Sequence, residues 1–257
     1  MEPLEIVILI VGGFFCGIFN TLAGFGSVIS LAIYMDILNI PGHIANATNR
    51  VNILASSNIA GYTFYKNGKL NLSGDKKFIV AILIGVVVGT IIASYINEEQ
   101  FKIAFKYLLI PIFLMLILNP KRFIEVQTDE APLTDWVTLP LIFLIGIYAG
   151  FIQAGFGILF LMIMVMLARY TIVKANALKI AVVAIYSFFV VGWFCWRGMI
   201  EWIPGLTMAL GQSIGGFITA RFLSKNEGAN KVAYWFIVVI VSLVMIKNFE
   251  LYKMLLK

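Results

Sequence analysis

Two cationic side chains lie among amides and hydroxyls in otherwise apolar sequence. Arg50 lies in the run IANATNRVNILASSN, and Lys179 lies in the run KANALKIAVVAIYS. Guanidinium and ammonium groups bind oxyanions, and a buried charge is costly unless an opposite charge compensates for it. The two runs therefore predict the binding of an anion. The alternative is that both side chains reach a lipid–water interface and bind nothing.

The polar residues of the first run share one face of a helix. At about 100° per residue they fall within an arc of about 200°, and so polar a face indicates contact with protein or water rather than lipid. They are Asn46, Thr48, Asn49, Arg50, Asn52, Ser56 and Ser57, with Asn58 as the exception. The second run carries a matching face, formed by Asn176, Lys179, Tyr186 and Ser187. Lys179 there occupies the position of Asn49.

A glycine-rich element occurs in each half of the chain. The first is NTLAGFGS, residues 20–27, within an apolar run from Leu4 to Met35, and the second is QAGFG, residues 153–157. Glycine lets the backbone turn, and the first amides of the following helix lack intrahelical partners and attract anions. The residues expected to contact an anion here are Asn20, Thr21, Gly24, Gly26, Ser27, Gln153, Gly155 and Gly157. Close helix packing is the alternative, and it is the favoured interpretation of Gly13, Gly17, Gly146 and Gly150.

The composition indicates an integral membrane protein. Of the 257 residues, 61% are hydrophobic and 12% are charged, whereas soluble domains have roughly 25% charged residues. The mean hydropathy is +0.97. The chain has room for about eight to ten spans of about 20 residues and for no separate soluble domain. No Lys or Arg precedes the first apolar run, so we expect a first span there rather than a signal peptide.

Enzyme chemistry is not expected. The sequence contains no GxxxxGK[ST], GxSxG or HExxH motif and no paired carboxylates at suitable spacing. One histidine, His43, and two cysteines in apolar runs, Cys16 and Cys195, do not suggest a metal site. We expect no cofactor, no metal and no nucleic-acid partner. The expected partners are a small anion and the lipid bilayer, and a homo-oligomer is left open.

Uncharged runs separated by charged or Gly/Pro clusters predict ten helical segments, since lipid tolerates only helices and closed barrels. The first five cover about 4–22, 26–38, 44–65, 77–96 and 101–118, and the last five about 136–153, 157–169, 175–196, 200–223 and 231–248. The second and seventh are too short to cross a hydrocarbon core of about 30 Å. Asp36, Asp135 and Glu201 fall at helix ends, where a solvated position is favoured over proton coupling.

The two halves of the chain repeat each other. AGFG at 23–26 matches AGFG at 154–157, ANA at 45–47 matches ANA at 175–177, and Gly68 matches Gly198. Beyond the AGFG element the offset settles at 130, as expected for a tandem duplication. This predicts a first repeat at 1–120, a polar linker at 121–135 and a second repeat at 136–257.

The charges of the loops orient the two repeats. If successive loops alternate between sides, one side collects most of the Lys and Arg residues, among them Lys66, Lys76, Lys121 and Lys174. The positive-inside rule makes that side cytoplasmic and places both termini outside. The second repeat then enters from the opposite side to the first. The predicted fold is an all-α membrane protein of two inverted helical repeats, with interrupted or short helices near the midplane.

The chain resembles the TauE/SafE family of membrane anion permeases over about residues 5–248. The resemblance rests on a duplicated unit: a Gly-rich element (AGFGS, AGFGI), a short helix, an ANA element (ANATN, ANALK) and a glycine-containing turn. It implies export of sulfite or an organosulfonate such as sulfoacetate across a prokaryotic plasma membrane. The chain departs from the family at Phe25, Ser27 and Phe156, where many members have a denser glycine run. It also has Leu178 where the first repeat has Thr48.

We therefore expect a multi-pass secondary transporter of a small anion. Arg50 and Lys179 would supply positive charge, and the AGFG helix starts would supply amides. The side chains that would orient the anion are Asn20, Thr21, Thr48, Asn49, Asn52, Gln153 and Asn176. The alternatives are an anion channel and an assembly subunit whose polar helix faces bind a partner helix.

Overall fold

The computed structural model describes residues 1–70, 72, 74–107 and 135–225, and within them the regular structure is helical. The first half contains α1 (Pro3–Ala23), α2 (Gly26–Ala32), α3 (Gly42–Lys66) and α4 (Lys76–Ala93). The second half contains α7 (Asp135–Ile152), α8 (Phe156–Met162), α9 (Ile172–Trp196) and α10 (Trp202–Lys225). Two π-helical turns, Ile33–Ile37 and Ile163–Leu167, continue α2 and α8, and residues 98–107 are also helical.

The all-helical prediction is confirmed in this part of the chain. The segment predicted at 101–118 is described only up to residue 107, and the segment predicted at 231–248 lies outside the described residues. α9 begins at Ile172 rather than at 175, because Thr171 caps it. The Thr171 hydroxyl accepts a hydrogen bond of 3.3 Å from the backbone N–H of Lys174 and so satisfies one of the unpaired amides of the first turn.

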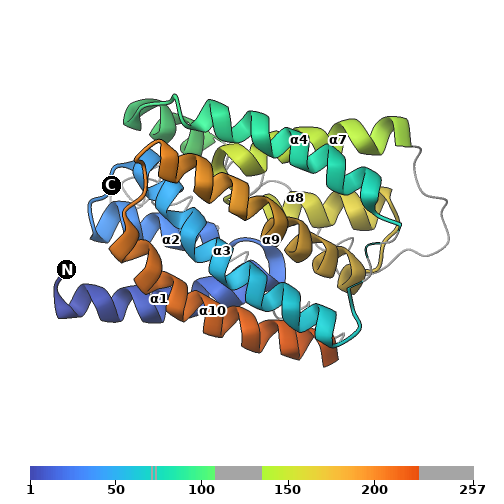
Figure 1. The fold of residues 1–257 in the computed structure, drawn as a ribbon, viewed down its shortest axis with the longest axis horizontal. Helices are drawn as coiled ribbons and strands as arrows, with labels where there is room; N and C mark the ends of the chain where they lie inside the picture. The colour runs from blue at the N-terminus through green and yellow to red at the C-terminus, as the bar shows by residue number, and fades with distance from the viewer. Residues whose placement is uncertain (71, 73, 108–134, 226–257) are drawn as a thin grey trace, which may run out of the picture.

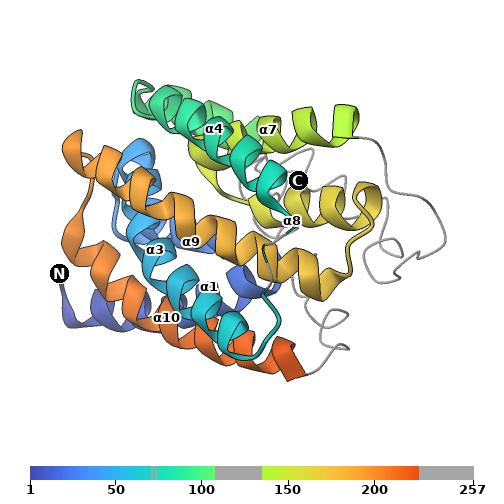
Figure 2. The same ribbon diagram turned by 45° about the vertical axis from the view of Figure 1, so that its right-hand side comes forward.

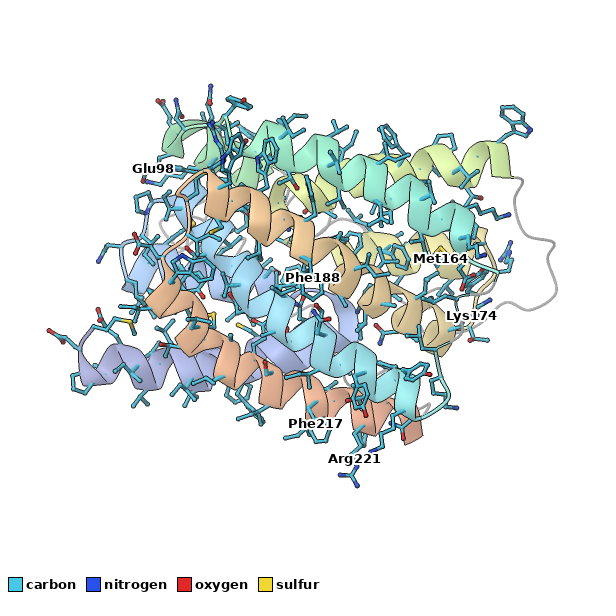
Figure 3. All side chains as sticks on the ribbon, viewed as in Figure 1. Glu98, Met164, Lys174, Phe188, Phe217 and Arg221 are labelled. Carbon is cyan, nitrogen blue, oxygen red and sulfur yellow. The ribbon has the colours of Figure 1, made fainter. Side chains whose placement is uncertain are left out.

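The protein is an all-α membrane protein. Three stretches are long and apolar enough to cross a bilayer, namely Pro3–Leu22, Lys76–Ala93 and Lys174–Trp196. Shorter apolar helices are Gly26–Ile37, Trp136–Ile152 and Phe156–Val165. Large apolar side chains such as Phe15, Ile84 and Phe188 are exposed. Such an outer surface is suited to lipid rather than water (Figure 3).

The helices pair across the two halves of the chain. Figures 1 and 2 show α3 and α9 in the middle of the bundle, α1 beside α10, and α4 beside α7. The first helix of each half thus packs against a later helix of the other half. The halves interlock, so neither is a self-contained bundle.

Glycines allow this close pairing. A Cβ added at Gly13 would lie 2.5 Å from the carbonyl oxygen of Met208, and one added at Gly146 would lie 2.5 Å from that of Ile82. Real Cβ atoms do not come so close to backbone, and Gly17 and Gly150 are in similar contact with α10 and α4. The packing interpretation of these four glycines is therefore confirmed.

The backbone repeats its special conformations at equivalent positions. Positive φ angles occur in the pairs Asn39 and Arg169, Gly24 and Gly155, and Gly68 and Gly198. Figure 1 also shows that α1 begins at the end of the bundle that carries the N-terminus, whereas α7 begins at the opposite end. In the same view α8 turns back toward the end at which α7 begins. Short helices thus return from the interior instead of continuing across it.

Gly146 offers a test of the glycine contact between α4 and α7. Leucine at this position must push the two backbones apart, and such overpacking costs about 1–3 kcal/mol. We expect Gly146→Leu to lower the midpoint of thermal unfolding in detergent. Gly192→Leu is the control, because a Cβ added at Gly192 meets nothing within 4 Å. Equal midpoints for the two variants would contradict the close packing.

Candidate anion-binding site

The two AGFG elements meet inside the bundle. Gly24, with a φ of 74°, directly follows the end of α1, and the break after α7 contains Gln153 and Gly155 with φ of 42° and 76°. At the first break the Gly24 N–H donates to the carbonyl of Asn20 at 2.8 Å, and the next N–H donates to that of Phe19. A Cβ added at Gly24 would lie 2.6 Å from the backbone nitrogen of Gly157. The structure therefore brings together two turns that lie far apart in sequence.

Each break leaves backbone carbonyls without intrahelical partners. The last four carbonyls of any α-helix face this problem, and in an apolar interior no bulk water is available to solve it. At the end of α7 the carbonyls concerned include Ala149, Gly150 and Phe151. At the end of α1 they include Thr21, whereas the Asn20 carbonyl already accepts a hydrogen bond from the Gly24 N–H. Side chains of α3 and α9 supply the missing donors.

Arg50 on α3 caps the end of α7. Its Nη1 donates to the carbonyl of Ala149 at 2.8 Å and to the Gln153 side-chain oxygen, and its Nη2 donates to the carbonyl of Gly150 at 3.0 Å. Asn46, one turn earlier on α3, donates to the carbonyl of Phe151 at 2.9 Å. Arg50 is 1% exposed. Its charge therefore lies at the negative end of the α7 dipole.

Lys179 on α9 caps the end of α1. Its Nζ donates to the carbonyls of Asn20 at 3.2 Å and Thr21 at 3.1 Å, and the residue is 2% exposed. Each buried cation thus caps a helix that belongs to the other half of the chain. Both side chains are buried within the bundle, whereas the interfacial interpretation requires them to reach its surface.

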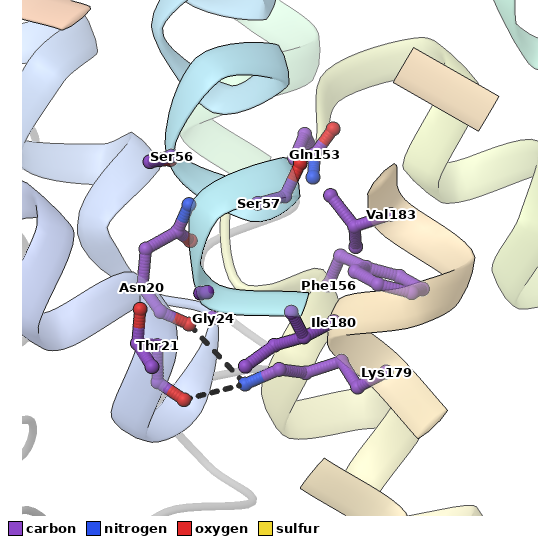
Figure 4. A pocket seen from close by; sticks show the side chains of 11 residues that line it. Asn20, Thr21, Gly24, Ser56, Ser57, Gln153, Phe156, Lys179, Ile180 and Val183 are labelled. Carbon is purple, nitrogen blue, oxygen red and sulfur yellow. Dashed lines mark hydrogen bonds between the residues drawn. The ribbon is translucent and has the colours of Figure 1, made fainter. Parts of the chain in front are cut away.

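A small cavity lined by both polar and apolar side chains lies between the two breaks (Figure 4). Its volume of about 20 Å³ exceeds the about 10–15 Å³ that one water molecule requires. Five of the predicted site residues line it, namely Asn20, Thr21, Gly24, Gln153 and Lys179. Ser56, Ser57 and Phe156 also line it, so one departure from the family pattern, Phe156, lies on the cavity wall. Lys179 is the charged residue of the lining.

A second group of buried polar side chains joins α3 to α2 and α10. Asn52 Nδ2 donates to Asn49 Oδ1 at 3.1 Å and to Gln212 Oε1 at 2.5 Å. Asn49 Oδ1 also accepts from the Ser30 hydroxyl, and Asn52 Oδ1 accepts from the Tyr34 hydroxyl. The network continues through Gln212 Nε2 to the Ser56 hydroxyl at the cavity. Asn49 and Asn52 therefore support the cavity wall without lining the cavity itself.

Sequence reasoning did not identify three members of this network, Ser30, Tyr34 and Gln212. The signal for Gln212 was available, because an amide in the middle of an apolar helix marks a polar interior. Ser30 and Tyr34 lie four residues apart and so share a helix face, but two hydroxyls in an apolar segment are too common to indicate a site.

The remaining predicted residues lie around the cavity rather than in its wall. Gly26 packs against α1, where an added Cβ would lie 2.9 Å from the Cβ of Asn20. The Thr48 hydroxyl accepts from the backbone N–H of Glu201 at 3.0 Å. Ser27 and Asn176 are buried, each with a side-chain oxygen that has no hydrogen-bond partner. Gly155, Gly157 and Arg50 likewise do not belong to the lining.

The carboxylates divide into exposed and buried ones. Asp36 and Glu201 are exposed, as expected for helix ends, and the side chain of Asp135 lies outside the described part. Asp75, which sequence reasoning passed over, is buried. In the described residues no group of three His, Cys, Asp or Glu side chains could hold a metal ion.

Comparison with known protein families identifies the family of this chain. The model of the family described as sulfite exporter TauE/SafE matches residues 9–247. The chain belongs to this family. Relatives of the chain include the "Probable membrane transporter protein ORF9" of a Sinorhizobium species, 28% identical over 91% of this chain and 89% of the relative. Another is the "Probable membrane transporter protein YfcA" of Escherichia coli K12, 25% identical over 88% of this chain and 84% of the relative. No solved structure matches the chain.

TauE/SafE membership and the apolar helices together make the protein a membrane transporter. Two contacts of the site can be tested by stability alone.

The first test concerns the meeting of the two AGFG elements. Gly24→Ala places a Cβ in a left-handed backbone conformation, at a cost of about 1–2 kcal/mol, and also against Gly157. Gly68→Ala carries the same conformational cost, with φ of 68°, but its Cβ meets nothing within 4 Å. We expect Gly24→Ala to unfold at a clearly lower temperature than Gly68→Ala. Matching unfolding temperatures would mean that the two elements do not touch.

The second test concerns the cap on α7. Arg50→Met removes the donors to two carbonyls and one amide oxygen, and each buried acceptor left unpaired costs about 1–3 kcal/mol. We expect a large loss of thermal stability, partly restored in Arg50→Lys. Arg221→Met is the control, because Arg221 lies on the outer surface of α10 (Figure 3). Wild-type stability of Arg50→Met would exclude the capping role.

Proposed function

We propose that this TauE/SafE protein is a secondary transporter that exports a small sulfur oxyanion or organosulfonate, such as sulfite or sulfoacetate. The main support is the position of Lys179, whose ammonium lines the cavity between two broken helices. Broken helices near the midplane are where secondary transporters bind their substrates. The family description and the names of the relatives agree with such a role.

Lys179 has the capacity to bind an anion without leaving its cap. An ammonium carries three N–H donors, and two of them go to the carbonyls of Asn20 and Thr21. The third is free for an oxyanion in the cavity. Among the described residues no carboxylate forms an ion pair with Lys179, so an anion would compensate for a charge that is already buried.

Gln153 offers a second donor. Its side-chain oxygen accepts from Arg50, which leaves the NH₂ group of the amide to point elsewhere. Because Gln153 lines the cavity, this group can donate to the anion. In this arrangement Arg50 acts on the anion indirectly. It holds the Gln153 side chain and contributes positive electrostatic potential at the cavity. Ser27 and Asn49 each keep a buried polar atom without a partner, so they could contact the anion in another conformation.

The size of the cavity favours a carrier over an open channel. A volume of about 20 Å³ holds water but not a sulfonate, so the anion enters only when the helices move. Movement of one repeat against the other would give alternating access. We further propose that the repeats, 1–120 and 136–257, are inverted and joined by a cytoplasmic linker, with both termini outside a prokaryotic plasma membrane. The opposite starting points of α1 and α7 support this arrangement (Figure 1).

Binding measurements with Lys179→Met test the proposed site. Methionine keeps the apolar stem and removes the charge, and the loss of a charge-assisted contact in a desolvated pocket should weaken binding by about 2–4 kcal/mol. The ligands for isothermal titration are sulfite, sulfate, thiosulfate, sulfoacetate and taurine. The control is Lys69→Met, since Lys69 is exposed beyond the end of α3.

Wild-type affinity in Lys179→Met would place the anion elsewhere. If no ligand of the panel binds or shifts the thermal stability of the wild-type protein, the assembly role becomes the better account, because a ligand of the folded state must stabilise it.

A further inference from the structure

A buried carboxylate lies outside the candidate site, at the start of α4. Asp75 is 1% exposed, and among the described side chains it is the one buried Asp or Glu. An Asp before the first residue of a helix commonly bonds the amides of that helix, but the Asp75 side chain does not. Its Oδ1 instead accepts a hydrogen bond of 2.5 Å from the Tyr170 hydroxyl and lies 3.7 Å from Lys174 Nζ. The carboxylate thus joins α4 to the segment that leads into α9.

Aromatic contacts strengthen this junction. Lys174 Nζ lies 3.8 Å from the centroid of the Tyr170 ring, and Phe78 of α4 packs edge-on against the same ring at 6.2 Å between centroids. The side chain of Lys174 is 48% exposed. Water can therefore reach the cation and compete for it, whereas it does not reach the carboxylate.

The other half of the chain has no counterpart of this cluster. At the offset of 130, the positions of Asp75, Tyr170 and Lys174 correspond to Gly205, Ile40 and Ile44. None of these can form an ion pair. Gly205 packs directly on α3, since an added Cβ would lie 3.3 Å from side-chain carbons of Thr48 and Val51.

The two equivalent helix pairs also differ in how closely they pack. α10 follows α3 over much of its length, whereas α4 touches α9 over a much shorter stretch. Direct packing joins α10 to α3, whereas at the start of the second pair the polar cluster connects α4 to the first turn of α9 and the segment before it. Water can replace the partners in an ion pair or a hydroxyl hydrogen bond. It cannot replace an apolar contact between a backbone and side chains.

We propose that Asp75, Tyr170 and Lys174 form a latch that holds closed one mouth of the cavity. The inference rests on the proposed transport function. Lys174 and Lys179 lie five residues apart on α9, or about 7.5 Å along its axis, so the latch lies near the cavity cation. Figure 3 places Lys174 at the end of the bundle opposite the N-terminus, where α3 ends and α4 begins. This is the end expected to face the cytoplasm.

Opening the latch must admit water to Asp75. A carboxylate separated from its partners cannot stay buried, because its desolvation is no longer offset. Release of Lys174 and Tyr170 therefore accompanies hydration of the mouth. The latch would keep the cavity closed until movement of α4 away from α9 lets water and the anion pass.

Alkylation of a single cysteine in the cavity tests the latch. The reporter is Ser57→Cys in a protein in which Cys16 and Cys195 are replaced by alanine and serine, and the reagent is a membrane-impermeant maleimide. We expect Asp75→Asn, which keeps the shape of the side chain and removes its charge, to raise the alkylation rate about tenfold, which corresponds to about 1.4 kcal/mol. Tyr170→Phe should raise it less. The exchanged pair Asp75→Lys with Lys174→Asp should return the rate toward that of the reporter protein.

The control is Glu98→Gln, which removes an ion pair of 2.6 Å with Lys102 at the other end of the bundle and should leave the rate unchanged. If Asp75→Asn does not fold, Lys174→Gln gives the same readout, since its side chain is half-exposed. Unchanged rates in the variants that fold overturn the latch. Alkylation needs no substrate, so unchanged rates with sulfite binding retained reject the latch alone, whereas absent binding in the wild type rejects the proposed function alone.

Discussion

The end of an α-helix inside a membrane requires donors for its last carbonyls, and the structure depends on how two such ends are satisfied. α1 and α7 both stop within the bundle at glycine-rich turns. Lys179 and Arg50 reach across from the central helices and supply the donors, each to the helix of the other half. Without Arg50 the Ala149 and Gly150 carbonyls, and without Lys179 the Thr21 carbonyl, would lose these donors in an apolar interior, at a cost of about 1–3 kcal/mol per group.

The exchange of caps explains why the halves interlock. A cation on α3 can reach the end of α7 only if α7 lies against the first half, and the contact of α4 with α7 through Gly146 brings it there. The same holds for Lys179, α1 and α10. The two breaks then face each other, and the space that the turns cannot fill becomes the cavity. A site that needs charge and donors is thus built from groups that the fold already requires.

The two cations nevertheless differ in what they can do. The guanidinium of Arg50 is engaged by two carbonyls and an amide oxygen, and it does not line the cavity. The ammonium of Lys179 lines the cavity and has a donor to spare. A planar, multidentate group suits a fixed brace, whereas a compact ammonium on a flexible stem suits a contact that is made and broken.

Much of the fold could be predicted from the sequence because it depends on local sequence patterns. The lengths of the apolar runs predicted the helices, and the AGFG elements predicted the helix breaks. The polar face of α3 indicated a buried interior. The partners of Arg50 and Lys179 could not be predicted, because they are backbone carbonyls, which every residue carries and no sequence pattern marks. Gln212 indicated a polar interior, but its partners and those of Tyr34 are side chains of other helices, and no local pattern shows which helices meet. Asp75 was passed over because its burial depends on α9 packing over the start of α4.

We propose that the cavity between the two capped breaks carries a small sulfur anion by alternating access. Counterflow in proteoliposomes distinguishes such a carrier from a channel or an assembly subunit. Vesicles loaded with unlabelled sulfite or sulfoacetate and placed in a trace of the radiolabelled anion should accumulate label transiently above the outside concentration, whereas chloride-loaded vesicles should not. Such exchange requires a carrier that binds the anion on both sides. Uptake that does not depend on the internal anion, or no uptake beyond that of protein-free vesicles, would contradict the account.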